Sequence, residues 1–395
     1  MSRPHVFKIM KGNIMDFKFS PEEKDIIYMV REFCMKEVLP IAAQLDEEER
    51  FPEETVRKLA DMGLMGISFP EEYGGGGMTY LTYIAVCEEI AKFCASTSVT
   101  LSAHSSLCCT PIYDFGTEEQ KRKYLVPLLT GEHLGAFALT EPSAGSDAAM
   151  QKTTAVDKGA HWLINGSKIF ITNGGYADTI VVIAMTDKEK GNQGISAFIV
   201  EKGFKGFSVG KNEKKMGIRA SSTTELIFED MAVPKENLLG ELNKGFKVAL
   251  TTLDGGRLSI AAQALGIAEG ALAECIKYVK QRVQFGQTIS RFQNTQFELA
   301  DMYTKIAASR HFTNRAAQAK QDGERYNHFA AMAKLHASNT ANDVARRCIQ
   351  LVGGYGYMRE YPFERFVRDA KITEIYEGTS EIQKIVIANY LGLNK

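Results

Sequence analysis

The strongest β signal in the chain is Trp162-Leu163-Ile164-Asn165-Gly166-Ser167-Lys168-Ile169-Phe170-Ile171. Apolar and β-branched residues lie on both sides of Asn165-Gly166, and an Asn-Gly pair is the preferred turn of a two-residue hairpin. We therefore predict a tight hairpin with its turn at these two residues. The tripeptide Asn165-Gly166-Ser167 also matches a glycosylation sequon, but no secretory signal accompanies it, so a turn is the better interpretation.

Short strand-like segments continue on both sides of this hairpin. They are rich in β-branched or aromatic residues and are separated by turn signals. We expect strands at Gly135 to Leu139, His161 to Ile164, Lys168 to Thr172, Thr179 to Met185, Ile195 to Val200 and Thr224 to Phe228. The middle third, residues 136–245, is therefore predicted to be an antiparallel β domain.

Helical spacing dominates the chain before and after this middle third. Ser20-Pro21-Glu22-Glu23 combines a capping residue with Pro at the first helical position, and Thr117-Glu118-Glu119-Gln120 forms a capping box. We predict an N-terminal helical domain at residues 16–135. No strand alternates with helices in the chain, so a parallel βαβ sheet is not expected.

A C-terminal four-helix bundle is predicted at residues 246–395. After Gly245, apolar residues recur in steps of three and four, as the buried face of a packed helix requires. They are Leu258, Ala261, Leu265, Ala268, Leu272, Cys275 and Val279. Later helices are expected around Leu299 to Ala319, Asn327 to Leu351 and Ser380 to Leu391. Together with the domains before it, the bundle gives an α+β multidomain fold.

Composition argues against several classes of function. The 395 residues contain 47 Lys and Arg against 48 Asp and Glu, so neither nucleic acid nor an anionic membrane is an expected partner. Seven cysteines without a CxxC pair and seven histidines without an HExxH spacing predict neither disulfides nor a metal site. Residues 1–15 are interpreted as an extension without the apolar core of a signal peptide, which favours a soluble intracellular protein.

The common nucleotide-binding motifs are absent from the sequence. No GxGxxG follows a strand and no GxxxxGK[ST] occurs, so neither a Rossmann site nor a P-loop is predicted. Gly353-Gly354-Tyr355-Gly356 is glycine-rich but follows a helix, which makes it a weak phosphate loop when taken alone.

A carboxylate in a glycine hinge precedes the last predicted helix, in the segment Ile375-Tyr376-Glu377-Gly378-Thr379-Ser380-Glu381-Ile382-Gln383. Thr379 and Ser380 are good N-cap residues, and Ser380 with Gln383 fits a capping box. Glu377 is our candidate catalytic base. On this segment alone, the simpler interpretation is that Glu377 is one more acid favoured by the helix dipole.

Five motifs in order resemble the acyl-CoA dehydrogenase family, and the resemblance covers about residues 16 to 395. They are Leu139-Thr140-Glu141-Pro142-Ser143-Ala144-Gly145-Ser146-Asp147, Gly166-Ser167-Lys168-Ile169-Phe170-Ile171-Thr172-Asn173-Gly174, Arg282-Val283-Gln284-Phe285-Gly286, Gln350-Leu351-Val352-Gly353-Gly354 and Ile375-Tyr376-Glu377-Gly378-Thr379. The resemblance implies helical, β and helical domains, an FAD cofactor, and a homotetramer built as a dimer of dimers. It also implies oxidation of acyl-CoA thioesters to trans-2-enoyl-CoA, in which Glu377 removes the α-proton and flavin N5 takes the β-hydride.

The resemblance also implies cofactor contacts, although each motif has an ordinary local interpretation as a turn, a hairpin or a helix end. The implied contacts are Phe137, Ala138, Leu139, Thr140, Ser146, Phe170, Ile171, Thr172, Arg282, Phe285, Gln293, Gln350, Leu351, Gly353, Gly354, Thr379, Ser380 and Glu381. Arg282 and Gln293 would reach FAD that is bound mainly by a neighbouring subunit. Many members have Trp where this chain has Phe170, so we expect different stacking against the flavin.

Substrate contacts implied in the same way are Ser146, Asp254, Arg257, Tyr376 and Gly378. Asp254-Gly255-Gly256-Arg257 stands at the start of the long helix in our prediction, where capping is an equally good local interpretation. Some family members carry their catalytic Glu in this region. Glycines at positions 255 and 256 leave Glu377 as the base that the family pattern allows.

The segment Ser98 to Leu107 resembles the acyl-pocket helix of bacterial short-chain, or butyryl-CoA, members of the family. We therefore expect a short-chain substrate, with butyryl-CoA and crotonyl-CoA as the pair, and an electron-transferring flavoprotein as partner. Such enzymes also run in reverse, sometimes with electron bifurcation. The resemblance implies a cytoplasmic location in a bacterium, or the mitochondrial matrix in a eukaryote.

Other functions remain as alternatives. They are a medium- or branched-chain acyl-CoA dehydrogenase, an oxygen-using acyl-CoA oxidase relative, and a helical scaffold or binding protein without chemistry. An oxidase would release peroxide with butyryl-CoA, and a scaffold would be colourless and indifferent to Glu377. In an enzyme, an apolar pocket should raise the pKa of Glu377 while the helix dipole opposes the rise.

Overall fold

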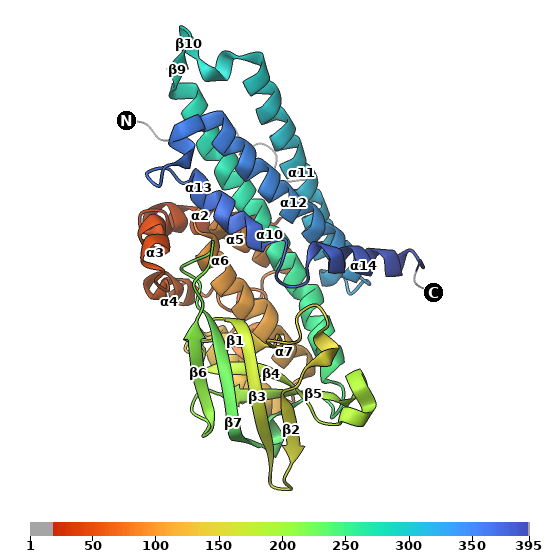
Figure 1. The fold of residues 1–395 in the computed structure, drawn as a ribbon. Helices are drawn as coiled ribbons and strands as arrows, with labels where there is room; N and C mark the ends of the chain where they lie inside the picture. The colour runs from red at the N-terminus through yellow and green to blue at the C-terminus, as the bar shows by residue number, and fades with distance from the viewer. Residues whose placement is uncertain (1–18, 394–395) are drawn as a thin grey trace.

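The chain folds into a helical, a β and a second helical part, in the predicted order (Figure 1). The computed structural model describes residues 19–393, so the predicted extension at residues 1–15 lies outside the described residues. In Figure 1 the sheet lies at one end of the molecule and the long helices extend away from it. The N-terminal helices pack where these two parts meet.

The N-terminal part is helical, and both predicted helix starts are confirmed. Ser20 and Glu23 form a capping box before α2 (Pro21–Phe33), and Thr117 and Gln120 form another before α8 (Glu118–Gln120). The other elements here are η1 (Cys34–Val38), α3 (Ala42–Glu48), α4 (Glu53–Asp61), η2 (Glu71–Tyr73), α5 (Tyr80–Ala91), α6 (Ala95–Ser102), η3 (Ala103–Cys109), α7 (Thr110–Phe115), η4 (Lys121–Leu125) and α9 (Val126–Leu129).

An eight-stranded sheet forms the middle part, in the order β6-β7-β3-β2-β4-β5-β8 with β1 beside β4. Its strands are β1 (Gly135–Ala138), β2 (Thr154–Asp157), β3 (His161–Thr172), β4 (Thr179–Met185), β5 (Ile195–Glu201), β6 (Phe207–Asn212), β7 (Thr223–Pro234) and β8 (Leu238–Leu239). Most neighbours are antiparallel, but β1 and β2 both run parallel to β4, so the sheet is mixed. The sequence did not predict β2, β6 and β8; no side chain of β6 is fully buried, and β8 has only two residues.

The predicted hairpin at Asn165-Gly166 is wrong, because both residues lie inside β3 and the turn before this strand is at residues 158–160. Asn165 marks a register shift against β7, where its side chain exchanges two hydrogen bonds with Asp230, at 3.1 and 2.8 Å. Gly166 has φ +142°, and a β-carbon there would collide with Thr153. The Asn-Gly pair therefore serves a β-bulge instead of a turn.

Long helices form the C-terminal part around α10 (Gly245–Gln281), which also packs on α5. The other elements are β9 (Val283–Gln284), β10 (Gln287–Thr288), η8 (Ile289–Arg291), α11 (Gln293–Gln321), α12 (Asn327–Val352), η9 (Gly353–Tyr357), α13 (Phe363–Ile372) and α14 (Ser380–Tyr390). Helix α13 was not predicted from the sequence. Helix α10 is long and apolar enough to cross a membrane, but 89% of its most apolar window is buried inside the protein, as in a core helix.

The position of Asp254 also differs from the prediction. Helix α10 begins at Gly245, so Asp254 lies well inside it and not at its start. Since the helix dipole acts mainly on the terminal turn, capping does not explain this residue. Its carboxylate instead accepts a hydrogen bond from Arg257 Nη1 at 2.5 Å.

Candidate functional site

Glu377 lies in the connection between α13 and α14. Its φ is +51° and that of Gly378 is +92°, so two successive residues have left-handed backbone. This conformation costs a residue with a β-carbon about 1–3 kcal/mol. The hinge brings the carboxylate against α10, where a β-carbon at Gly256 would collide with Glu377 Oε2 and with Leu107.

The environment of the Glu377 carboxylate suits a base. Its Oε2 atom is buried and makes no hydrogen bond with any described residue. Burial raises the pKa of Glu377 to about 8, and the positive charges of Lys334 and Arg257 oppose that rise. A base whose pKa lies near the working pH is partly ionised and still binds a proton strongly. The direction of the Glu377 pKa shift agrees with the effect expected of an apolar pocket.

The start of α14 differs from the predicted capping box. Thr379 is the N-cap, and its hydroxyl accepts a backbone N–H from the first turn. Gln383 does not close a box with Ser380, because its Nε2 donates to the carbonyls of Gly378 at 2.8 Å and Glu377 at 3.3 Å. The Ser380 hydroxyl is buried without a partner among the described residues, so it is free to contact a ligand.

The predicted substrate contacts lie mostly on the two segments that meet here. The Tyr376 hydroxyl donates to Gln263 of α10, which ties the hinge to that helix. Arg257 is buried and paired with Asp254, while its Nε has no partner among the described residues. Ser146 lies on the loop after β1 and is exposed.

Several predicted cofactor residues meet where β1 ends and β3 bulges. The N–H of Ile169 donates to the carbonyl of Thr140 at 2.9 Å, which joins the two segments. Phe170 has φ +59° at a register shift in β3, and its side chain is 59% exposed. Phe137, Ala138 and Ile171 have buried side chains, whereas Leu139, Thr140 and Thr172 are partly exposed. This edge therefore offers an aromatic ring and two hydroxyls to a ligand.

A buried ion pair fixes this edge, and the sequence did not predict it. Lys168 on β3 is fully buried, and its Nζ donates to Glu141 Oε1 at 2.8 Å and to the carbonyl of Leu139 at 2.9 Å. Glu141 also accepts the N–H of Thr153 at 3.0 Å. Burial lowers the pKa of Lys168 to about 8, and the Glu141 carboxylate opposes that change. Because a buried pair needs all its hydrogen bonds, the loop after β1 is held firmly against β3.

Segment η3 connects this edge to the base. The N–H of Gly135 in β1 donates to Nδ1 of His104 in η3 at 2.9 Å. Leu107, one turn further along η3, lies beside Gly256 and the Glu377 carboxylate. The predicted acyl-pocket segment, which ends at Leu107, therefore runs between β1 and the base.

A third group lies at the end of the bundle opposite the sheet, near β9 and β10 (Figure 1). Arg282 caps the C-terminus of α10, and its guanidinium lies 5.4 Å from the centre of the Tyr355 ring. Arg282, Leu351 and Gly354 border a cavity of about 550 Å³. Phe285, on the turn between β9 and β10, is 93% exposed. One chain thus keeps these predicted residues far from Glu377.

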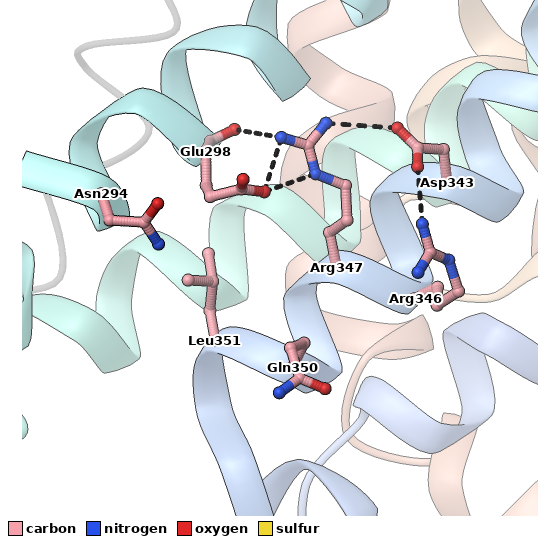
Figure 2. Close-up of a pocket in the computed structure, with 7 residues that line it drawn as sticks. All are labelled: Asn294, Glu298, Asp343, Arg346, Arg347, Gln350 and Leu351. Atoms are coloured by element: carbon pink, nitrogen blue, oxygen red, sulfur yellow. Dashed lines mark hydrogen bonds and ion pairs between the residues drawn. The ribbon is translucent and has the colours of Figure 1, made fainter.

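Figure 2 shows a neighbouring pocket of about 450 Å³ on α11 and α12. Arg347 is held there by Glu298 at 2.6 Å. Gln350 and Leu351 follow on the same helix, and Figure 2 shows no such interaction for either of them. The predicted cofactor residues Gln293 and Gly353 are exposed at this end of the molecule. Glu381 is also exposed, but it lies in the first turn of α14, beside the hinge that carries Glu377.

Family models match nearly the whole chain. The acyl-CoA dehydrogenase N-terminal domain matches residues 20–132, the middle domain matches 136–231, and the C-terminal domain matches 243–392. A short-chain specific acyl-CoA dehydrogenase of Clostridium acetobutylicum is 59% identical over 374 residues, which cover 95% of this chain and 99% of that protein.

Two solved structures share the fold at a TM-score of 0.94 each. Butyryl-CoA dehydrogenase from Megasphaera elsdenii is 50% identical, and the match covers 95% of this chain and 100% of that one. A structure reported for the electron transferring flavoprotein of Acidaminococcus fermentans, in work on flavin-based electron bifurcation, is 55% identical and covers 95% and 99%. The three-part architecture therefore agrees with the fold expected from the five sequence motifs.

Proposed function

The chain belongs to the acyl-CoA dehydrogenase family, and we propose that Glu377 is the base with which it interconverts short-chain acyl-CoA and enoyl-CoA. The protein is an FAD-dependent oxidoreductase that acts on a CH–CH bond. One observation carries the assignment of the base. The Glu377 carboxylate is buried, unpartnered among the described residues, and set against the bare Cα of Gly256 by a strained backbone.

Glu377 moves the proton in this reaction. Oε2 forms a bond to the proton of C2 as the C2–H bond breaks. Bound FAD supplies the acceptor for the hydride that leaves C3. In the reverse direction the protonated carboxyl returns its proton to C2, since both directions pass through one transition state. The same residue therefore serves acyl-CoA dehydrogenation and enoyl-CoA reduction equally well.

The thioester oxygen gains negative charge when the C2 proton leaves, so it needs donors fixed in advance. The backbone N–H of Glu377 has no acceptor in the described part of the chain. It lies on the same residue as the base, so any substrate that presents C2 to the carboxylate comes close to it. We propose this N–H as one donor to the thioester oxygen.

The chain fits FAD at two places. At the edge of β1 and β3, the exposed Phe170 ring and the Thr140 and Thr172 hydroxyls would hold the flavin. At the far end of the bundle, Arg282 would grip the diphosphate, and no atom lies within 4 Å of a β-carbon built at Gly354. Open space at that glycine is what a backbone close to a ligand requires.

We propose that a second copy completes each cofactor site, in a homotetramer built as a dimer of dimers. The support is that within one chain the first place lies in the sheet and the second lies at the far end of the helical bundle, near β9 and β10 (Figure 1). We also propose domain limits at residues 16–135, 136–245 and 246–395, because β1 and α10 begin beside these limits.

Mixed oligomers test the shared cofactor site. Arg282→Ala alone is expected to weaken FAD binding by about 10- to 150-fold, since it removes a charge-assisted contact. When Arg282→Ala and Glu377→Gln chains are co-expressed with different tags, mixed dimers have one intact site, which combines Glu377 of one chain with Arg282 of the other. Random mixing should restore about a quarter of the wild-type activity. No recovery in purified mixed oligomers would mean that each chain binds FAD alone.

We propose butyryl-CoA and crotonyl-CoA as the substrate pair and an electron-transferring flavoprotein as the electron partner. The support is the similarity to the short-chain enzyme of Clostridium acetobutylicum and to the Megasphaera and Acidaminococcus structures. Leu107 beside the base also suits a short pocket. Because these relatives are bacterial, we propose a cytoplasmic location.

Anaerobic titration of the flavin absorbance tests the substrate assignment. Butyryl-CoA should bleach the flavin faster than octanoyl-CoA or isovaleryl-CoA. Faster bleaching by octanoyl-CoA would contradict the short-chain proposal. Peroxide release in air at the rate of turnover would instead indicate an oxidase, and absence of bleaching by any of the three would contradict the proposed reaction.

A further inference from the structure

Lys334 on α12 is a fully buried lysine in contact with the hinge that carries the base. Its exposed fraction is 0%, and its Nζ donates to the carbonyl of Gly378 at 2.8 Å. Among residues 19–393, no carboxylate oxygen lies within ion-pair distance of this nitrogen. A buried ammonium without a counter-ion is costly, so its position beside a catalytic hinge needs an explanation.

The hinge itself is held from two helices. The Gly378 carbonyl accepts from Lys334 of α12 and from Gln383 of α14, both at 2.8 Å. Gln383 also donates to the carbonyl of Glu377 at 3.3 Å. Left-handed backbone at a residue with a β-carbon persists only when its surroundings fix it. Removing one of the two donors should therefore let the hinge relax and the carboxylate turn away from Gly256.

We propose that Lys334 is a positioning residue for this reaction, which aims Glu377 through the Gly378 carbonyl and stabilises its ionised form with a buried positive charge. The inference rests on the proposed role of Glu377 as the base. It gives the unpaired ammonium a partner that is present only when the carboxylate has lost its proton. The two opposite charges then face each other at the start of the proton transfer, and the transfer removes the negative one.

The charges around Glu377 favour Lys334 over its neighbours for this role. Arg257 on α10 is also close, but it already forms an ion pair with Asp254 at 2.5 Å. Tyr80 on α5 and Tyr376 in the hinge are buried phenols whose pKa values burial raises well above the usual range, so they stay neutral. Lys334 thus supplies the unmatched positive charge.

Two further acids, Glu374 and Glu381, face Lys334 from the ends of α13 and α14. Glu374 is engaged by Lys371 at 2.6 Å, and Glu381 is exposed. Burial lowers the pKa of Lys334 to about 8, and the Glu377 charge opposes that change. The positive charge of Lys334 lowers the pKa of Glu377, so removing it should raise that pKa.

The test is the pH profile of anaerobic flavin bleaching by butyryl-CoA in Lys334→Met. We expect the rise of the rate with pH to move upward by about one pH unit or more, as for loss of a nearby opposite charge. At pH 7 the bleaching rate should fall at least about tenfold. Lys334→Arg keeps the positive charge, so its pH profile should lie close to that of the wild type. Infrared difference spectra between each variant and its Glu377→Gln counterpart follow the Glu377 carboxyl band directly and should show the same displacement without turnover.

Lys320→Met is the matched control. Lys320 lies on α11, burial likewise lowers its pKa to about 8, and its opposing charges are Asp114 and Asp254. Its removal should leave the pH profile of bleaching in place. If Lys334→Met does not fold, as judged by thermal melting, Lys334→Gln replaces it.

An unchanged profile and carboxyl band in a folded Lys334 variant would overturn the inference and leave Lys334 a purely structural residue. A wild-type protein whose flavin does not bleach would overturn the proposed function instead. The two failures are therefore distinguishable.

Discussion

Glu377→Gln is expected to slow anaerobic bleaching of the flavin by butyryl-CoA by about 100- to 10,000-fold, the usual contribution of a positioned general base. The amide has nearly the same shape as the carboxyl group, so it fits against Gly256. It cannot accept the C2 proton, and proton removal then depends on water in a site that buries the Oε2 position. The measurement is stopped-flow absorbance of the flavin at saturating substrate.

Glu374→Gln is the matched control for this variant. Glu374 lies three residues earlier, and its side chain pairs with Lys371 at the surface. A surface pair contributes little, so this change should leave the bleaching rate near that of the wild type. Bleaching at the full rate in Glu377→Gln, with the same flavin content, would show that another group removes the proton.

Glu377→Gln also has an expected effect on stability, and the sign of that effect follows from the raised pKa of Glu377. The pKa of Glu377 is about 8 in the folded chain and 4.5 for the free side chain. Between these values the folded state holds a proton that the unfolded state has released, so the free energy of unfolding falls as pH rises. The slope from one such group is roughly 1.4 kcal/mol per pH unit. The melting temperature of Glu377→Gln minus that of the wild type should therefore be larger at pH 9 than at pH 5.

Local signals predicted the helix starts well, because a cap involves only residues within one turn. Ser20 with Glu23 and Thr117 with Gln120 formed the expected capping boxes. Ser380 with Gln383 has the same spacing and did not form one. There the Gln383 amide bonds to the Gly378 and Glu377 carbonyls of the strained hinge instead. A spacing rule cannot anticipate an acceptor that exists only because the backbone takes a rare conformation.

The Asn165-Gly166 error has the same origin. An Asn-Gly pair supplies left-handed or open backbone, which both a turn and a bulge use. Two residues from other parts of the sheet favour the bulge. Asp230 is hydrogen-bonded to the Asn165 side chain, and Thr153 packs against the Cα of Gly166. Pairing partners across a sheet are tertiary information, so the pair alone predicted β structure correctly and its connection wrongly.

Buried charges were the features of the site that sequence patterns could not reveal. Lys168 and Lys334 are both fully buried, although lysine is mostly exposed in proteins. Their burial depends on a carboxylate or carbonyl contributed by another element, Glu141 for the first and Gly378 for the second. The candidate base was found because its neighbours in sequence resemble a family motif, whereas the residues that hold it are dispersed over α10, α12 and α14.

Gly256→Ala is expected to reduce bleaching by about 100-fold or more, because a displacement of about 1 Å at a catalytic group costs that much. A β-carbon at this position would collide with Glu377 Oε2, and it would lie 2.7 Å from a methyl carbon of Leu107. The carboxylate is the free end of a side chain, so it should move and leave the fold intact. Alanine is more favourable than glycine in a helix interior by about 1 kcal/mol. This gain offsets the cost of moving the side chain, so the melting temperature should change little.

Gly255→Ala separates this effect from any general effect of alanine in α10. The two glycines are adjacent in the same helix, and a β-carbon at Gly255 would come within 2.8 Å of the Lys320 Nζ atom, the end of a flexible side chain. That amine can shift without touching Glu377, so this variant should keep its bleaching rate within about one order of magnitude of the wild type, the displaced group being remote from the proton transfer. Equal losses in the two variants would mean that α10 tolerates no added methyl group in this turn. A loss confined to Gly256→Ala would mean that the bare Cα is there to make room for the base, and a crystal structure of the variant should then show the carboxylate turned away from α10.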